Sequence, residues 1–387
     1  MSMAVVPDVR GIIEQFKRLP DPRSTINRRH LLVDIIVISI CGVLGGADGP
    51  EAIAEWAKTK KQWLRKYLKL PNGIPSHDTI GRVLERLQPA AFQECFAAWL
   101  ETLQTGDGGS EPSAQQRQVS IDGKTLRRSH DRRHGLGPLH LVSAWATQKG
   151  ISLGQVATEE KSNEITAIPA LLERIDVSDA VVTIDAMGCQ KDIAEKIIEG
   201  DGDYVLALKG NQGTLHAAVE AYFSQHLEND FADVKVSRLT TKEKGHGRKE
   251  QRYYFQLPVP ADLPGRRDWR GLRTIGMAIR VCEVNGQETS EVRHYICSTK
   301  RNIKQFAAAV RGHWSIENTL HWSLDVMFRE DESRTRGRRI ADNLAWIRRL
   351  VLTLLKQHPG KGSLVMKRRK AGWSVDFLME LLTGTSS

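Results

Sequence analysis

The sequence predicts a mixed α/β protein in which a strand-and-helix core lies between helical segments. Strand-like and helix-like runs alternate between residues 117 and 231 in the order β-β-β-α-β-α-β-α. Four further strand-like runs fill residues 232–299. Apolar residues recur at helical spacing in the first 100 residues and again from residue 303.

Residues 1–104 are expected to form a helical N-terminal domain. The segment 50–70, PEAIAEWAKTKKQWLRKYLKL, has apolar residues at helical spacing and ends at the turn signal PNGIP. Ser76 can then cap a second helix, HDTIGRVLERL. A helix pair with lysines on its first member suits recognition of DNA ends, and a domain that only packs is an equally good interpretation. Residues 105–116 are predicted to be a linker.

The core is expected to be interrupted once. Its first part would occupy 117–231, the strand-like runs of 232–299 would form a β-rich insertion, and helical residues 300–356 would complete the core. Residues 357–387 would form a basic tail that contains KRRK at 367–370, for which a solvated charged face is the preferred interpretation. The core strands are predicted at 117–122, 139–147, 151–158, 180–185 and 203–209, with a helix after each of the last three.

Charge indicates a class of partner. The 387 residues carry 56 Lys and Arg against 46 Asp and Glu, for a net charge of +10. This excess suits a polyanion such as nucleic acid, because each phosphate contact releases counterions. Charge alone fits a merely soluble basic protein equally well. The five cysteines form no CxxC pair, which argues against a zinc ribbon or a disulfide framework and fits a reducing cytoplasm.

No membrane segment is expected. The first thirty residues are charged throughout and lack the early apolar stretch of a secretory signal. The apolar run 31–47, LLVDIIVISICGVLGGA, is shorter than the roughly 20 residues of a spanning helix and contains Asp34. It is predicted to be a buried helix.

Two carboxylates stand in matching positions. Asp122 in SIDGK and Asp185 in TIDAMG each end a short apolar run and precede Gly or Ala. An acid at the end of a buried strand is costly unless it is paired, hydrogen-bonded or bound to a metal. Functional groups also gather at the carboxyl ends of strands in α/β sheets. Taken singly, either acid fits a turn or a helix N-cap; a third carboxylate on a later helix favours a catalytic set.

Glu317 is the candidate for that third carboxylate. It lies midway between His313 and His321 in HWSIENTLH, at steps of four that would stack all three on one helix face. One ion cannot bind all three, because a rise of about 1.5 Å per residue separates the outer two by roughly 12 Å. The histidines are therefore expected to contact substrate phosphate or to orient the acid. Trp314 and Trp322 could stack on a displaced base, although core packing is the favoured interpretation.

Several separate segments, in order, closely resemble the ISAs-type insertion-sequence transposases, also called H-repeat-associated proteins. These segments are SIDGKTLRRS, EKSNEITAIPALL, VVTIDAMGCQ, LALKGNQ and HWSIENTLHWSLDVMFRED. The resemblance extends from about residue 10 to the end. The related Y-x2-R-x3-E-x6-K pattern is not present, since Val310, His313 and Leu324 occupy those positions around Glu317.

The resemblance implies a DDE transposase: a ribonuclease-H-like mixed-sheet core with a β-rich insertion, preceded by an α-helical N-terminal domain. It assigns Asp122, Asp185 and Glu317 as catalytic acids. Three hard oxygen donors suit Mg²⁺ or Mn²⁺, and two ions would serve an in-line phosphoryl displacement. The expected partners are the inverted repeats of the element and target DNA, bound by a homodimer in the synaptic complex. A ribonuclease-H-like nuclease without strand transfer and an inactive DNA-binding relative are the alternatives.

Basic and polar side chains near these acids are expected to contact DNA phosphates. They follow the first acid, follow the fifth strand, form the tip of a hairpin in KEKGHGRKE, or flank Glu317. The predicted DNA-binding residues are Lys124, Arg127, Arg128, Lys209, Asn211, Gln212, Lys244, His246, Arg248, Arg311, His313 and His321. A solvated charged face is the alternative interpretation for each cluster.

Overall fold

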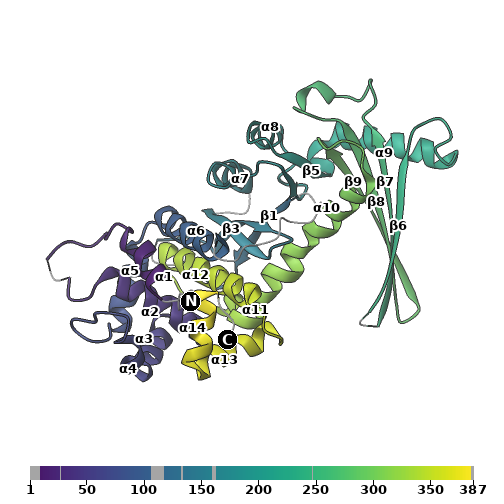
Figure 1. Ribbon diagram of the computed structural model, residues 1–387. Helices are drawn as coiled ribbons and strands as arrows, with labels where there is room; N and C mark the ends of the chain where they lie inside the picture. Colours follow the sequence, from purple (N-terminus) through teal and green to yellow (C-terminus); the bar gives the residue numbers. More distant parts are fainter. Residues whose placement is uncertain are drawn as a thin grey trace, which may run out of the picture.

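The computed structural model describes residues 9–26, 28–105, 117–131, 134–158, 163–245 and 247–384. In this part of the chain the strands form one sheet in the order β3-β2-β1-β4-β5-β9-β8-β7-β6. Helices cover both faces of its core half, as Figure 1 shows. The strands are β1 (Arg117–Leu126), β2 (Leu139–Ala146), β3 (Ile151–Thr158), β4 (Ala180–Ile184), β5 (Asp203–Leu208), β6 (Ser237–Gly245), β7 (Arg248–Pro258), β8 (Thr274–Val284) and β9 (Gln287–Cys297).

The parallel strands β1, β4 and β5 position the predicted acids. Ile121 of β1 pairs with Ile184 of β4, and Ile184 pairs with Leu206 of β5. The residues that follow Ile121 and Ile184 therefore emerge at the same edge of the sheet. The strands β2 and β3 are antiparallel to this group and extend the sheet on the other side of β1.

The strands of residues 232–299 continue the core sheet. β9 pairs antiparallel with β5, and β8, β7 and β6 follow in turn. In Figure 1 these long strands reach well beyond the layer of core helices. Their continuity with β5 brings the middle of β9 beside the edge that carries the acids, because His294 pairs with Leu208, the last residue of β5.

Core helices form two layers around the sheet. On one face α7 (Glu164–Leu172), α8 (Lys191–Glu199) and α9 (Gly213–Glu228) bury a cluster that includes Ile121, Ile184 and Leu206. On the other face α10 (Ile303–Ser315) packs Phe306 and its neighbours against Val181 and Tyr295. α12 (Arg338–Gln357) covers β1 and β2 on that same side.

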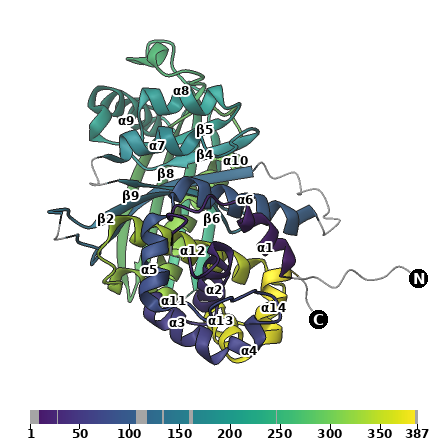
Figure 2. The same cartoon turned by 90° about the vertical axis from the view of Figure 1, so that its left-hand side faces the viewer.

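The N-terminal helices share one core with the C-terminal helices. α1 (Arg10–Lys17), α2 (Leu32–Leu44), α3 (Pro50–Thr59), α5 (His77–Arg86) and α6 (Pro89–Thr105) contribute to an apolar cluster with α11, α12, α13 and α14. In Figure 2 the purple and yellow ends of the chain interleave in the lower part of the molecule. The remaining helices are α4 (Lys61–Leu64), α11 (Trp322–Phe328), α13 (Leu364–Trp373) and α14 (Val375–Thr383).

The predicted buried helix within residues 31–47 is confirmed as α2, whose residues are buried almost without exception. Asp34 accepts a hydrogen bond from the amide of Leu70 at 2.9 Å, which satisfies the acid inside the core. Among the described helices, none is long and apolar enough to cross a membrane. Ser76 caps α5 as predicted, accepting from the amide of Thr79.

The interpretation of the tail sequence KRRK as a solvated charged face is wrong for its first two residues. Lys367 and Arg368 are buried in α13. Arg368 donates to the carbonyl of Val43 at 3.1 Å and to the carboxylate of Asp48 at 2.9 Å. The tail therefore fastens the end of the chain onto the N-terminal helices. The predicted linker lies almost entirely outside the described residues.

Candidate active site

Asp122 lies on a polar face of β1. Val119 and Ile121 point into the core beneath α7–α9, so the alternation of the strand turns Ser120 and Asp122 toward α10 and α11. The Asp122 side chain is 15% exposed. Burial raises its pKa to about 8, and the nearby carboxylate of Asp185 acts in the same direction. A charge this poorly compensated marks a position that a cation would stabilise.

Asp185 follows β4 and is held in place by backbone amides. Its Oδ1 accepts from the amides of Met187 at 3.0 Å and Gly188 at 3.3 Å. The segment after β5 stabilises the loop that follows Asp185. Asn211 donates to the carbonyl of Ala186 at 2.7 Å, and Gln212 donates to the carbonyl of Cys189 at 3.0 Å. The two amides predicted to bind DNA are thus used to hold the Asp185 loop.

Glu317 lies where its helix changes geometry. α10 continues into a π-helical segment, η4 (Ile316–His321), and then into α11. Because a π-helix has more residues per turn than an α-helix, the steps of four no longer stack on one face. Nδ1 of His313 lies 3.2 Å from Oγ1 of Thr183, whereas Nδ1 of His321 lies 3.6 Å from Oδ2 of Asp122.

Burial raises the pKa of Glu317, and Asp185 adds to this effect, while the cation of Arg293 opposes it. Burial lowers the pKa of His313 to about 4 and that of His321 to about 3. Both imidazoles are therefore neutral at pH 7. They can orient or donate, and they do not act as cations toward a phosphate.

A cavity of about 270 Å³ opens between Asp185 and Glu317. Both carboxylates line this cavity, and Lys209 and Arg293 bring positive charge to it. The lining also contains aromatic and imidazole side chains from β9, α9 and α10. These are His216, His294, Tyr295, His313 and Trp314.

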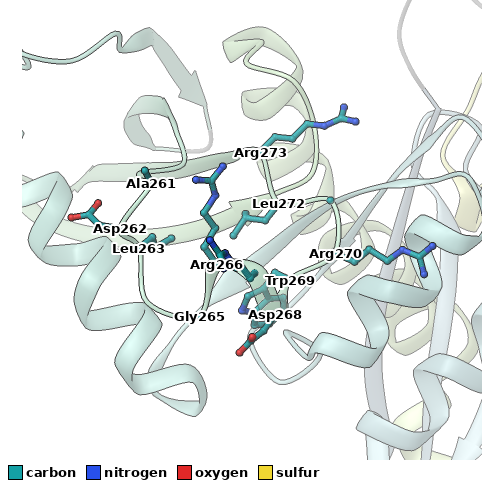
Figure 3. Close-up of a pocket in the computed structure, with 12 residues that line it drawn as sticks. Ala261, Asp262, Leu263, Gly265, Arg266, Asp268, Trp269, Arg270, Leu272 and Arg273 are labelled. Carbon is teal, nitrogen blue, oxygen red and sulfur yellow. The ribbon is translucent and has the colours of Figure 1, made fainter.

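A larger cavity of about 1040 Å³ lies in the loop 261–273 between β7 and β8. That loop leads into Thr274, which pairs with Cys297, while Cys297 pairs with Val205 near the start of β5. The loop is thus at the sheet edge opposite the acids. Figure 3 shows the side chains of Arg266, Arg270 and Arg273 diverging, so they do not form a convergent site.

The donors at the acid edge fit a divalent cation. Asp122, Asp185 and Glu317 offer only hard oxygen atoms, the ligands that Mg²⁺ and Mn²⁺ prefer. Burial, and after it the charge of Asp185, raises the pKa of Asp122, and a bound cation would favour the ionised form of this acid. Across the described ranges no three His, Cys, Asp or Glu side chains converge closely enough to form a ready-made metal cage. Binding of an ion would therefore have to draw the three acids closer together.

Lys124 is not an open cation. It is 8% exposed, and its ammonium contacts the carboxylates of Asp325, Asp331 at 3.4 Å and Glu330 at 3.8 Å. Glu330 is fully buried between this lysine and the arginines of α12. Lys124, a predicted DNA contact, therefore links β1 to α11 and the segment after it. Its charge is already neutralised by these carboxylates.

The other predicted DNA contacts are mostly exposed. Arg127 lies 3.2 Å from Asp331, and Arg128 is exposed at the end of β1. Lys209 is exposed at the cavity. Lys244 and Arg248 are exposed on the hairpin of β6 and β7, while His246 lies outside the described residues.

Arg311 joins α10 to this hairpin through an ion pair with Glu243 at 3.0 Å. The two tryptophans have different surroundings. Trp314 lies under the guanidinium of Arg293, 4.1 Å from ring centroid to Cζ. Trp322 is 59% exposed, so core packing is the wrong interpretation for it.

Sequence reasoning missed Arg293 and a buried pair beside β1. Arg293 sits in a strand-like run with no local signal that it meets Glu317. His140 Nε2 lies 2.7 Å from Oε1 of Glu164, and both side chains are buried. A Cβ on Gly123 would lie 2.3 Å from that oxygen, so only glycine lets the pair pack against the residue next to Asp122. Glu164 lies within EKSNEITAIPALL, and that motif was the available signal.

Comparison with known proteins identifies the family of this chain. The family model described as "Transposase DDE domain" matches residues 113–354, and the "DDE_Tnp_1-associated" model matches residues 13–100. The chain belongs to the DDE transposase family. The predicted ribonuclease-H-like fold class is thereby confirmed for this transposase, with its mixed sheet and preceding helices.

Relatives match the transposase along nearly all its length. It is 38% identical to "H repeat-associated putative transposase YhhI" of Escherichia coli K12, over 98% of this chain and 99% of the relative. It is also 38% identical to "Putative transposase YncI" of E. coli O157:H7, over 98% and 96%. A short relative, "Inactive transposase YbfQ" of E. coli K12, is 37% identical over only 20% of this chain.

Proposed function

We propose that this chain is an active DNA transposase of a bacterial insertion sequence. It would hydrolyse DNA at the ends of its own element, free 3′-hydroxyl groups and transfer them into target DNA. The observation that supports this most directly is that two acids from parallel strands and a third from a later helix lie near enough for their charges to raise the pKa of Asp122 and of Glu317. The catalytic acids would be Asp122, Asp185 and Glu317.

These three carboxylates would hold two divalent ions, Mg²⁺ or Mn²⁺. When bound, such a pair activates the attacking oxygen and stabilises the leaving oxygen of a phosphodiester. The protein's own groups would prepare the site. His321 would orient Asp122, the amides of Met187 and Gly188 would fix Asp185, and the cavity beside Glu317 would exclude bulk water from the bound strand.

DNA would approach the acid edge of the sheet. Arg128, Lys209, Lys244 and Arg248 are exposed cations suited to phosphate contacts. The partners would be the terminal inverted repeats and target DNA, brought together by a homodimer in the cytoplasm. The helical N-terminal region would recognise the ends.

Two other functions remain to be tested against this one. A ribonuclease-H-like nuclease would cut ends without joining them, and an inactive relative would bind DNA only. The presence of all three acids, near enough in the fold for their charges to raise the pKa of Asp122 and of Glu317, favours catalysis over binding alone.

The test is a strand-transfer assay. Labelled element ends, taken from the inverted repeats that flank the gene, are incubated with the purified chain, a target plasmid and Mg²⁺. We expect cleavage and joining by the wild type, and neither reaction by Asp122→Asn, Asp185→Asn or Glu317→Gln, with end binding retained. Asp176→Asn is the matched control, because this acid pairs with Arg117 at the opposite end of β1. Cleavage without joining indicates the nuclease, binding alone indicates the inactive relative, and joining by Asp185→Asn refutes the three-acid assignment.

A further inference from the structure

Arg293 brings the insertion strands to the acid edge. His294 pairs with Leu208 at the end of β5, so Arg293, the residue before it on β9, reaches the level of Lys209. The side chains of β9 alternate, and Tyr295 packs on Phe306 of α10. Arg293 therefore points to the same face of the sheet as α10, where Glu317 follows.

The guanidinium of Arg293 is held in position by Trp314 and Glu291, and neither of them is a buried acid that would neutralise its charge. Its Cζ lies 4.1 Å from the centroid of the Trp314 ring. Its Nε donates to Oε1 of Glu291 at 2.8 Å, and Nη2 lies 2.7 Å from the same oxygen. Nη1 makes no hydrogen bond or ion pair within the part of the chain that the structure describes. Glu291 is 44% exposed, so water screens this ion pair.

The surroundings of Arg293 suit an anion. It lines the cavity of about 270 Å³ together with Lys209, Asp185 and Glu317. A planar guanidinium stacked on an indole keeps its edge free for a bidentate contact with phosphate oxygens. An anion seated in this cavity would have two cations, Lys209 and Arg293, and two of the candidate catalytic acids among its neighbours.

We propose that Arg293 contacts the phosphodiester backbone of the DNA strand being cut, and that Trp314 is the positioning residue that holds its guanidinium. The insertion would thereby supply a residue that touches substrate. This inference rests on the proposed function, and it gives a role to the strand of residues 232–299 that passes beside the acid edge. Arg293 supplies there a permanent positive charge, which the neutral His313 does not.

The experiment combines protein variants with neutral phosphates. Element ends are made with a single methylphosphonate at each position around the scissile bond, and cleavage rates are measured for the wild type, Arg293→Gln, Arg293→Lys and Trp314→Leu. Arg267→Gln is the charge-matched control, because this exposed arginine lies at the opposite sheet edge. End binding is measured by gel shift, and folding by circular dichroism.

We expect Arg293→Gln to slow cleavage by about 10²-fold, as for loss of one pre-positioned donor to a reacting oxyanion, with end binding within about threefold of wild type. Arg293→Lys and Trp314→Leu should show intermediate losses, and Arg267→Gln none. At one phosphate, the methylphosphonate should slow the wild type but cause no further loss in Arg293→Gln, because the contact is already absent.

Two results overturn the inference while leaving the proposed function intact. One is cleavage by Arg293→Gln at the wild-type rate. The other is that the losses from the variant and the methylphosphonate multiply at every position. If Arg293→Gln does not fold, Arg293→Lys takes its place in the same comparison. If the wild type cleaves no end at all, the proposed function fails, and this inference fails with it.

Discussion

Nδ1 of His321 lies 3.6 Å from Oδ2 of Asp122, and the imidazole is neutral because burial lowers its pKa to about 3. Its Nε2 is buried without a hydrogen-bond partner in the described structure. A neutral, buried imidazole beside an acid is suited to orient that acid, as the groups beside metal ligands do, and this is the role we propose for His321.

We expect His321→Ala to slow end cleavage by about 10- to 100-fold while leaving the fold and end binding intact, because Asp122 loses its orienting neighbour. Trp322→Ala is the control. The side chain of Trp322, the next residue along the chain, is 59% exposed. The stability of the Trp322→Ala variant should therefore stay within about 0.5 kcal/mol of wild type. Equal cleavage rates for His321→Ala and wild type in Mg²⁺ would refute the orienting role.

Gly312 allows α10 to lie close to β1. A Cβ at this position would come within 2.2 Å of Oε1 of Gln118, whose buried amide donates to the carbonyl of Ala309 at 2.9 Å. We expect Gly312→Ala to destabilise the fold by about 1–3 kcal/mol, and to slow cleavage because η4 and Glu317 follow directly.

The control for Gly312→Ala is Gly81→Ala in α5, where the nearest atoms to a new Cβ lie at 3.7 and 3.9 Å. This change should stabilise by about 0.5–1 kcal/mol, since alanine is the better helix former. Urea unfolding of both variants checks the pair. An equal effect of the two substitutions would show that α10 does not depend on close approach at Gly312.

The ion pair of Arg349 with Glu330 is fully buried, with Nη1 and Oε1 at 3.0 Å. Removing one member leaves the other charged and poorly solvated. We expect Arg349→Met to cost about 3–5 kcal/mol. The double variant Arg349→Met/Glu330→Gln should lose less than the sum of the single losses. Chemical denaturation of all three variants gives the coupling energy.

Arg329 and Glu332 form the matched exposed pair, with side chains 66% and 52% exposed. Arg329→Met should change stability far less than Arg349→Met does, because water screens such exposed pairs. The explanation from burial would not hold if the two arginine substitutions had similar effects.

Asp342 makes stability depend on pH. Burial raises its pKa from 3.8 to about 6, against the opposing hydrogen bond from Gln155 and the charge of Arg349. The pKa of Asp342 is higher in the folded state than in the unfolded state. Its contribution to the stability of the fold is therefore fully present below about pH 4. It is lost as the pH rises through about 6. At pH 7 the ionised, buried acid costs about 2–3 kcal/mol.

We therefore expect Asp342→Asn to be more stable than wild type above pH 6 and equal to it near pH 4. Unfolding midpoints measured between pH 4 and 8 check this window. Asp262→Asn, at an exposed acid, should show no such difference. A constant difference between Asp342→Asn and wild type at every pH would mean that burial of the charge is not the cause.

Local chemistry determined much of this protein. The apolar runs that end in Asp122 and Asp185 are buried strands, because short apolar segments flanked by turns cannot remain solvated. The run around Asp34 is a core helix, since a single acid can be satisfied by one backbone amide. The family resemblance added the pairing of those acids with Glu317, which no spacing rule could supply.

Only the tertiary structure decided which charges are free. The sequence suggests exposed cations at Lys124, Lys367 and Arg368. In the fold these side chains are buried, and they bind carboxylates or carbonyl groups of other segments. Sequence spacing likewise predicts an α-helix through Glu317, whereas the chain forms a π-helical segment there. Arg293 meets that segment because β9 pairs with β5, a contact between residues more than eighty positions apart. Such long-range pairing depends on how the whole chain packs, and local sequence patterns do not predict it.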